Sequence, residues 1–250
     1  MEMTLTQSDI SFQSNLYESK NPTRRWIHQA RRTWVLEKLY KFSKRKTSAL
    51  EVGTGCGTYT SRIGHLFGDA ASIDVNESFV KAAKMECPTV EVSVKDIQTL
   101  NLGRQYDVII MSEVLEHVPD TQLSLDRVYA HLSKNGYFLL TTPNKFSTTE
   151  LVARLLKIKV FAALAQKIYG EPVDDLGHIS LRTRAQLILE IDKAGFTILS
   201  REDMSFYLPV IAEFGGEWGK RVLQFCERQL KKSNVLRNLL WTQCYVLTKF

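Results

Sequence analysis

Residues 49–60 read Ala-Leu-Glu-Val-Gly-Thr-Gly-Cys-Gly-Thr-Tyr-Thr, and this stretch decides the fold. A short apolar run ends at Val52, and three glycines follow at alternate positions, Gly53, Gly55 and Gly57, before a helical pattern resumes. Glycine at such positions lets the backbone turn tightly and lets a ligand approach where a Cβ would collide. The stretch therefore predicts a strand, a ligand-binding loop and a helix.

Spacing to the next acidic residue narrows the kind of ligand. The nicotinamide fingerprint needs a third glycine at position 58, where Thr58 stands, so an NAD site is disfavoured. Asp74 closes a second short apolar run about twenty residues after Gly53. A carboxylate at the tip of the second strand can accept hydrogen bonds from both hydroxyls of a ribose. These features predict a site for a nucleoside-containing cofactor.

Two further stretches complete a recognisable pattern. Residues 90–94 alternate like a strand and lead to Asp96 and Ile97, and residues 106–111 lead into Ser112-Glu113-Val114-Leu115-Glu116-His117. With the glycine loop, this pattern resembles class I S-adenosylmethionine-dependent methyltransferases, especially the ubiquinone-pathway and small-molecule O-methyltransferases of the type 11-like group.

The resemblance implies S-adenosylmethionine as the cofactor, with its ribose on Asp74 and its adenine beside Asp96. Asn21-Pro22-x-Arg24 resembles the Asn-Pro-x-Arg of ubiquinone-pathway relatives, in which the arginine reaches the methionine carboxylate. The gap from Arg24 to the glycine loop is longer here, and Arg25 is the alternative. The expected cofactor-binding residues are Arg24, Glu51, Gly53, Thr54, Gly55, Gly57, Asp74, Val75, Asp96, Ile97 and Ser112.

Strand and helix patterns alternate from Thr47 onward, which is typical of a parallel sheet with helices on both faces. We expect a Rossmann-like, doubly wound α/β sheet of seven strands, mostly parallel with an antiparallel last strand, in one methyltransferase domain spanning 1–250. Its parts would be a helical N-terminal cap (1–47), a cofactor-binding half (48–144), an amphipathic insertion (145–177), and a C-terminal half with a helical excursion and the last strand (178–250).

The insertion has a character of its own. Large apolar residues between Leu151 and Ile168 are interleaved with Arg154, Lys157, Lys159 and Lys167. Such a basic amphipathic pattern fits a helix that lies on a membrane surface, as the corresponding insertion does in ubiquinone-pathway relatives. It equally fits a lid over the substrate pocket, and both interpretations remain open.

Candidates for acid–base chemistry follow the fourth strand and the insertion. His117 and His178 are the first choices, because histidine titrates near neutral pH without perturbation, and Glu113 is the third. Glu113, Glu116 and His117 would share one face of a helix, where some quinone-pathway relatives hold magnesium. Metal-free relatives carry similar strings, so no metal is included in the expectation. A structural role for His117 also stays open.

Composition limits the class of protein and its partners. The chain has 250 residues, 44% of them hydrophobic, with a net charge of +6, and no run of 18 apolar residues. The first residues lack signal-peptide features, so a cytoplasmic location is expected, with membrane-peripheral contact as the open addition. Four scattered cysteines predict reduced thiols.

The expected activity is methylation of a small or lipophilic molecule, with O-methylation favoured, and the expected partner is an amphiphilic small-molecule substrate. Nucleic acid is not expected, because base N-methyltransferases of this fold carry Asn-Pro-Pro-Tyr or a relative where this chain has Met-Ser-Glu-Val. A nucleic-acid (RNA) or protein methyltransferase, and one acting on a lipid-linked sugar or a fatty or terpenoid acid, are the alternatives. The sequence sets no oligomeric state.

Overall fold

The computed structural model describes residues 17–156 and 178–250. Within these residues one seven-stranded sheet has the order β3-β2-β1-β4-β5-β7-β6. Its strands, in chain order, are β1 (Ser48–Val52), β2 (Asp69–Asp74), β3 (Glu91–Val94), β4 (Tyr106–Ser112), β5 (Leu132–Pro143), β6 (Thr197–Met204) and β7 (Thr242–Thr248). Strands β1 to β5 pair in parallel, whereas β7 runs antiparallel to both β5 and β6. The expected mostly parallel sheet with an antiparallel last strand is confirmed.

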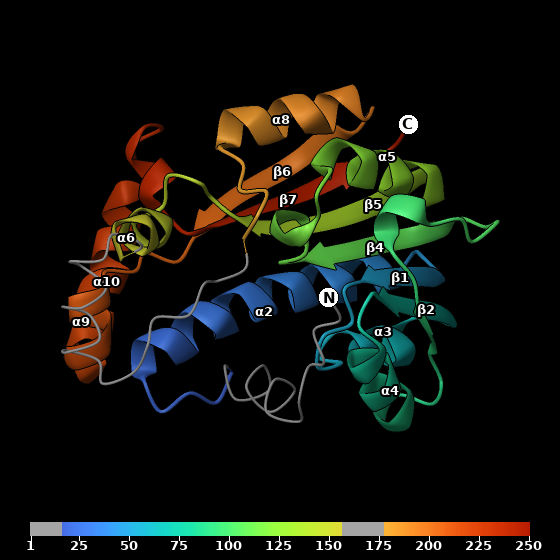
Figure 1. Cartoon of the computed structure of the whole chain (residues 1–250), viewed down its shortest axis with the longest axis horizontal. Coiled ribbons are helices and arrows are strands. Elements are labelled where there is room, and N and C mark those ends of the chain that lie inside the picture. The colour runs from blue at the N-terminus through green and yellow to red at the C-terminus, as the bar shows by residue number, and fades with distance from the viewer. Residues whose placement is uncertain (1–16, 157–177) are drawn as a thin grey trace.

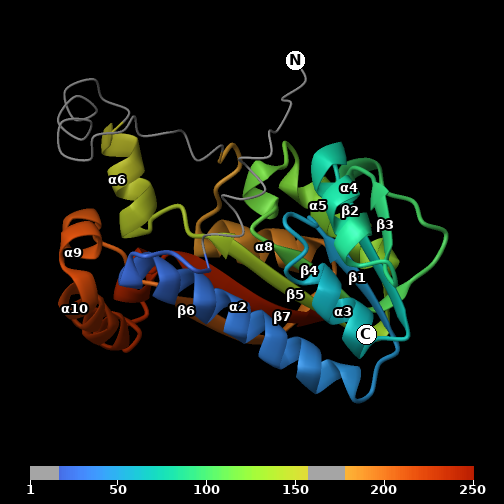
Figure 2. The same cartoon turned by 90° about the horizontal axis from the view of Figure 1, so that it is seen from below.

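Helices cover both faces of the sheet (Figures 1 and 2). The first face carries α2 (Pro22–Ser43), α3 (Thr60–Leu66) and α4 (Glu77–Glu86), and the opposite face carries α5 (Thr121–His131) and α8 (Arg184–Lys193). Each face buries its own apolar cluster, one containing Trp34, Leu39 and Ile63, the other Leu125, Leu187 and Ile191. The doubly wound prediction therefore holds on both sides.

The helix of the N-terminal cap begins where the sequence places its cap. The side chain of Asn21 accepts hydrogen bonds from the backbone N–H groups of Thr23 (2.9 Å) and Arg24 (3.0 Å), and Pro22 occupies the first turn. Both features favour helix initiation, because an N-cap oxygen satisfies backbone donors that otherwise lack partners. The resulting 22-residue helix crosses the sheet diagonally in Figure 2.

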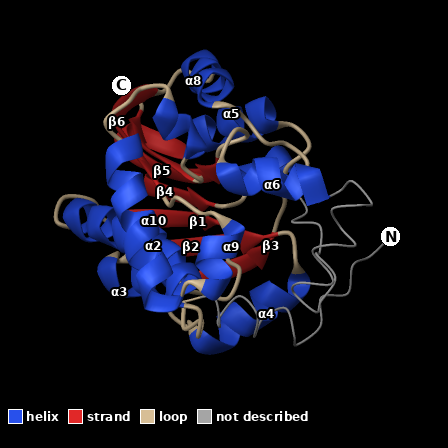
Figure 3. Cartoon of the chain, turned by 90° about the vertical axis from the view of Figure 1, so that its left-hand side faces the viewer, coloured by secondary structure: helices blue, strands red, loops and turns tan. Residues whose placement is uncertain are grey.

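A third group of short elements lies at one end of the molecule (Figure 3). It comprises α6 (Thr148–Leu156), α9 (Pro209–Phe214), α10 (Gly216–Leu230) and a 3-10 turn at Leu236–Leu239. Phe206, Ala212, Leu223 and Leu240 form a small separate core there. Helices α9 and α10 and the 3-10 turn lie where the helical excursion before the last strand was expected, whereas α6 belongs to the start of the insertion.

Most of the amphipathic insertion lies outside the described residues, and only α6 at its start is placed. The membrane-contact and lid interpretations of residues 145–177 therefore stay predictions. No helix among the described residues is both long and apolar enough to cross a bilayer.

The order in which the chain adds strands to the sheet reverses direction between β1 and β4. From β1 the chain proceeds outward to β2 and β3, and it then returns to pair β4 with the other side of β1. In open α/β sheets, ligands bind beyond the carboxyl ends of the strands at such a reversal. The fold thus directs attention to the loops after β1, β2, β3 and β4.

Candidate functional site

The glycine loop after β1 adopts backbone conformations that suit glycine. Gly53, Gly55 and Gly57 have φ values of +88°, +48° and +78°. A Cβ added to Gly53 would lie 2.2 Å from Cγ2 of Val114, so the loop packs directly against the segment that follows β4. Glycine is therefore needed at position 53 for two reasons, the positive φ of the turn and the close approach of Val114.

A cavity of about 710 Å³ lies against this loop. Most residues lining it come from the ends of β1, β2, β3 and β4 and the loops that follow them, as the topology requires. Of the residues predicted from the sequence, those on the cavity wall are Glu51, Gly53, Thr54, Gly55, Asp74, Val75, Asp96, Ile97, Ser112, Glu113 and His117. Gly57, Arg24 and His178 are not on that wall.

Asp74 is held in place by the glycine loop. Its Oδ2 accepts a hydrogen bond from the backbone N–H of Gly55 (3.1 Å), and its Oδ1 accepts one from Asn76 (2.9 Å). Burial raises the pKa of Asp74, while these backbone hydrogen bonds act in the opposite direction. Each carboxylate oxygen has a further lone pair, so Asp74 can still accept hydrogen bonds from a ligand in the cavity.

Asp96 and Ile97 mark the end of the third strand. Asp96 caps the 3-10 turn Ile97–Thr99, with its Oδ1 accepting from the backbone N–H of Gln98 at 2.8 Å. Ile97 is buried and presents an apolar surface to the cavity. Asp96 therefore offers a carboxylate oxygen, and Ile97 an apolar surface, at neighbouring places on the cavity wall.

Glu51 is almost fully buried, with 1% of the residue exposed. Its Oε2 accepts hydrogen bonds from Thr60 Oγ1 (2.5 Å) and Ser72 Oγ (2.9 Å), which tie β1 to α3 and β2. Burial raises the pKa of this carboxyl group to about 8. Its Oε1 has no hydrogen-bond partner among the described residues, although Glu51 lines the cavity. That oxygen is available to a donor on a ligand.

The structure places a different arginine at the cavity from the one predicted. Nε of Arg24 lies 2.8 Å from Oε1 of Glu213, a residue of α9, and Arg24 does not line the cavity. Arg25 is also directed elsewhere, since it donates to the carbonyl oxygen of Ser19 at 3.1 Å. Arg24 and its alternative Arg25 therefore do not lie on the cavity wall, which disfavours the expected contact of either with a cofactor bound there.

Arg31 occupies the expected place instead. It lies on α2 seven residues after Arg24, on the same side of the helix because seven residues make about two turns. Arg31 is 8% exposed and lines the cavity, and its Nη1 pairs with Glu113 Oε2 at 2.8 Å. Although burial acts against the charge, the Glu113 carboxylate raises the pKa of Arg31 above its usual value.

Sequence reasoning overlooked Arg31 because the motif points to Arg24. The sequence does contain one clue, the long gap between that motif and the glycine loop. Arg31 lies about two helical turns after Arg24 on α2, so it is closer to the loop in sequence. Other wall residues that the sequence did not single out are Tyr59 and Phe79. In the sequence both have the pattern of ordinary core residues. Tyr59 comes directly before α3, Phe79 lies in α4, and both are buried.

Glu113 does not begin a helix, contrary to the expected helical face of Glu113, Glu116 and His117. Its φ is +56°, a left-handed conformation that is uncommon for residues other than glycine, and only a 3-10 turn follows at Leu115–His117. The backbone N–H of Glu113 donates to the carbonyl of Thr141 (2.9 Å), and its Oε1 accepts from Thr141 Oγ1 (3.0 Å). With these contacts in place, the Glu113 carboxylate pairs with Arg31.

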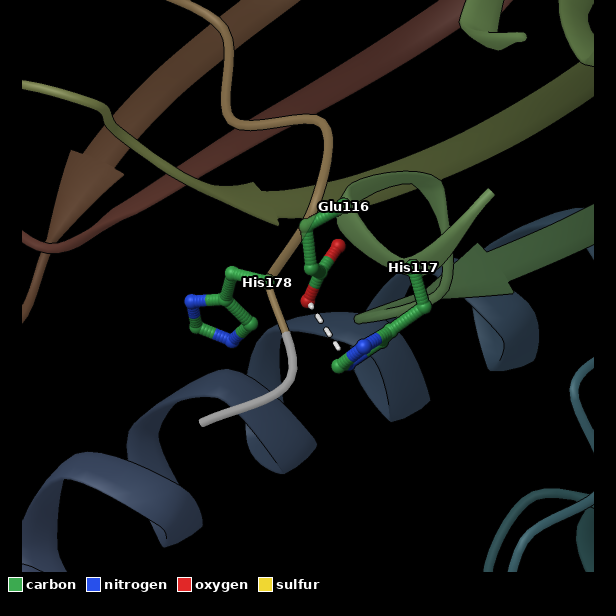
Figure 4. A group of neighbouring side chains, drawn as sticks. All are labelled: Glu116, His117 and His178. Atoms are coloured by element: carbon green, nitrogen blue, oxygen red, sulfur yellow. Dashed lines mark ion pairs between the residues drawn. The ribbon is translucent and has the colours of Figure 1, made fainter. Parts of the chain in front are cut away.

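The two candidate histidines approach one another from distant parts of the chain. Their ring centroids are 5.2 Å apart, and Figure 4 shows them on either side of the Glu116 carboxylate. His117 lies on the cavity wall, whereas His178 lies behind it with its Nδ1 3.1 Å from Oε1 of Glu150. Burial raises the pKa of Glu116 well above its usual value, and the nearby Glu113 acts in the same direction.

Comparisons with known proteins agree with this fold and cavity. A protein-family profile described as "Methyltransferase domain" matches residues 24–201. The chain is 38% identical over 97 residues to a malonyl-[acyl-carrier protein] O-methyltransferase of Bacillus cytotoxicus, covering 37% of this chain and 34% of that protein. It is 28% identical over 100 residues to a ubiquinone biosynthesis O-methyltransferase of Nitrobacter winogradskyi, covering 38% of each. The matches thus span little more than a third of these relatives.

Among solved structures, magnesium protoporphyrin IX methyltransferase from Synechocystis PCC 6803, with bound SAH, superimposes with a TM-score of 0.62. The alignment covers 98% of this chain and 95% of that one at 14% identity, which shows a shared fold. The family profile covers well over half of the chain and includes the glycine loop, Asp74 and Asp96. The chain therefore belongs to the methyltransferase-domain family, within the class I S-adenosylmethionine-dependent methyltransferases.

Proposed function

We propose that this protein binds S-adenosylmethionine in the cavity and transfers its methyl group to an oxygen atom of a small, lipophilic acceptor. One observation carries the cofactor assignment. Two buried wall residues have unused polar atoms of opposite kind, namely the donor Nε of Arg31 and the acceptor Oε1 of Glu51. The methionine part of the cofactor carries an α-carboxylate and an α-ammonium group, which are the complementary partners.

The rest of the wall fits the nucleoside part. Asp74 would accept the ribose hydroxyls, and the absence of side chains at Gly53 and Gly55 leaves the backbone open to close approach. Asp96 would accept a hydrogen bond from the adenine amino group, with Ile97 and Val75 against the ring. Thr54 and Ser112 line the same cavity between these groups.

The methyl donor is a sulfonium, so the chain's main task is to hold donor and acceptor in line. Such positioning can contribute roughly 7–11 kcal/mol to lowering the barrier. An acceptor hydroxyl must also lose its proton, and His117 and His178 are the proposed groups that act on it. Glu113 is less suited to this role than the sequence predicted, because it is paired with Arg31.

Transfer to oxygen is supported by two relatives whose names state O-methyltransferase activity. The acceptor class is narrowed by the composition of the amphipathic insertion, which begins with α6 and interleaves large apolar residues with basic ones. An amphiphilic phenol or quinol, a lipid-linked sugar, and a fatty or terpenoid acid all suit such surroundings. Methylation of RNA or protein is the alternative that the positive net charge keeps open.

Calorimetric titration with S-adenosylmethionine and, separately, with NAD⁺ tests the cofactor. We expect one equivalent of S-adenosylmethionine to bind and NAD⁺ to give no heat, and the reverse result would contradict the proposal. The acceptor is tested by incubating the protein and cofactor with phenol, carboxylic acid, amine and RNA panels and measuring products by mass spectrometry. Methyl esters or ethers support transfer to oxygen, whereas methylamines or methylated RNA contradict it.

A further inference from the structure

We infer that Glu116, His117 and His178 form a binding site for a divalent transition metal beside the cavity, whose wall includes His117. One ligand atom from each of these residues lies within 4.8 Å of those of the other two. Two imidazoles and one carboxylate form a donor set that suits zinc, iron, cobalt or manganese more than magnesium, which prefers oxygen ligands. The inference rests on the proposed function, because the metal would act on the acceptor of that reaction.

Glu116 provides the observation that points to a ligand. The residue is 1% exposed, and its Oε2 accepts a hydrogen bond from Thr142 Oγ1 at 2.9 Å. Its Oε1 has no hydrogen-bond partner among the described residues and lies 3.9 Å from Nε2 of His117. A buried carboxylate oxygen without a donor is costly, and a cation between it and the two imidazoles would remove that cost.

His178 is oriented as a metal-binding histidine commonly is. Oε1 of the buried Glu150 lies 3.1 Å from Nδ1 of His178, an ion-pair contact without hydrogen-bond geometry, so Nδ1 is beside this carboxylate and Nε2 is the nitrogen for a metal. A carboxylate at the far nitrogen sets the tautomer and raises the basicity of a metal-binding imidazole. Two backbone hydrogen bonds of 3.0 Å, from Ile179 and Ser180 to the carbonyl of Glu116, hold this segment beside the turn that carries Glu116 and His117.

The set differs from the one expected at the end of β4. Glu113 is not part of this set, because its carboxylate pairs with Arg31. His178, which lies 62 residues after Glu116 in sequence, is brought in by the tertiary fold. His117 is on the cavity wall with 44% of its side chain exposed, so a metal held by it would be accessible from the cavity.

A cation at this position would lower the pKa of an acceptor hydroxyl placed beside it. The O–H bond of the acceptor breaks and its proton passes to solvent. An oxygen lone pair then forms the new C–O bond, the C–S bond of the sulfonium breaks, and its electron pair stays on sulfur. In this arrangement the two histidines act on the acceptor hydroxyl through the metal that they hold, instead of taking its proton directly.

The test is metal binding by the ligand-free protein, independent of activity. After chelation and dialysis, Zn²⁺ and Mg²⁺ are titrated by calorimetry, and Co²⁺ is added to record visible absorption bands that depend on the ligand set. We expect one equivalent of Zn²⁺ to bind, with Mg²⁺ much weaker. Glu116→Gln and His178→Ala should weaken Zn²⁺ binding by at least about 100-fold and change the Co²⁺ spectrum, and Glu150→Gln by roughly 10–100-fold.

His65→Ala, which removes an exposed histidine on α3, is the matched control and should bind Zn²⁺ like the parent. Glu116→Gln keeps an acceptor for Thr142, and thermal unfolding verifies that each variant is folded. Absence of stoichiometric Zn²⁺ in the parent, or equal affinity in Glu116→Gln and His178→Ala, would overturn the metal site. S-adenosylmethionine titration of the same samples reports separately on the proposed function, because Arg31, Glu51 and Asp74 are unchanged in them.

Discussion

Nη1 of Arg31 lies 2.8 Å from Oε2 of Glu113, and this ion pair joins the long helix α2 to the end of β4 at the cavity wall. Because both groups are largely removed from solvent, removing either one would leave the other without its partner in a poorly solvated position. The pair leaves Nε of Arg31 without a partner among the described residues. It thus connects the N-terminal helix to the proposed cofactor site.

Replacing Arg31 should weaken cofactor binding much more than replacing Arg24. Arg31→Ala removes the proposed donor to the methionine carboxylate, and the loss of a hydrogen bond to a charged group costs about 1.5–3 kcal/mol, or roughly 10–100-fold in affinity. Arg24→Ala, seven residues earlier on the same helix, is the matched control and should leave affinity unchanged. Calorimetry with S-adenosylmethionine makes the comparison.

Arg31→Ala also leaves Glu113 unpaired in a partly buried position, which can destabilise the fold by itself. The double variant Arg31→Met with Glu113→Gln removes both charges and should regain thermal stability but not cofactor affinity. If Arg24→Ala weakens binding and Arg31→Ala does not, the assignment of the carboxylate to Arg31 is refuted.

Asp74→Asn should weaken S-adenosylmethionine binding by about 1.5–3 kcal/mol, because the ribose would lose hydrogen bonds to a charged acceptor. In the parent, Gly55 N–H donates to Oδ2 and Asn76 N–H to Oδ1, and the amide keeps an acceptor oxygen for only one of them, so thermal unfolding must verify that the variant is folded. Asp126→Asn on the outer surface of α5 is the control. Equal affinities for the parent and the Asp74 variant would remove Asp74 from the site.

Gly53→Ala should destabilise the protein more than Gly57→Ala. Both residues have positive φ, so each substitution introduces backbone strain of about 1–3 kcal/mol. A methyl group at Gly53 also meets Val114 at 2.2 Å, whereas one at Gly57 meets nothing within 4 Å. Thermal or urea unfolding measures the difference, and equal losses of stability in the two variants would show that the contact with Val114 relaxes freely.

The stability of the ligand-free protein should depend on pH through Glu51. Its folded-state pKa is raised to about 8 by burial, so the folded state holds a proton that the unfolded state has already lost. The stabilising contribution is therefore fully present below pH of about 4.5 and is lost as the pH rises to about 8, with a slope of up to about 1.4 kcal/mol per pH unit.

Glu51→Gln removes this titration while keeping an acceptor for Thr60 and Ser72. Urea unfolding at pH 5, 6.5 and 8 should show the variant gaining stability relative to the parent as the pH increases. A difference between the two proteins that stays constant over this range would mean that Glu51 is ionised throughout.

The sequence by itself determined the sheet, the glycine loop and the positions of Asp74, Asp96 and Ile97. Each of these depends on a few adjacent residues, because a strand, a glycine turn and a following helix are defined by local backbone preferences and by alternation of apolar residues. The carboxyl ends of parallel strands then meet at one edge, so residues after β1, β2, β3 and β4 converge there without further information.

Only the tertiary structure decided which arginine reaches the cavity and which side chains gather around Glu116 beside it. Arg24 and Arg31 share one side of α2, and the choice between them depends on how far α2 extends along the sheet and on Glu213 of α9, which pairs with Arg24. Glu116, His117 and His178 meet because backbone hydrogen bonds join segments some sixty residues apart. Such contacts depend on packing between distant elements, which local sequence patterns do not specify.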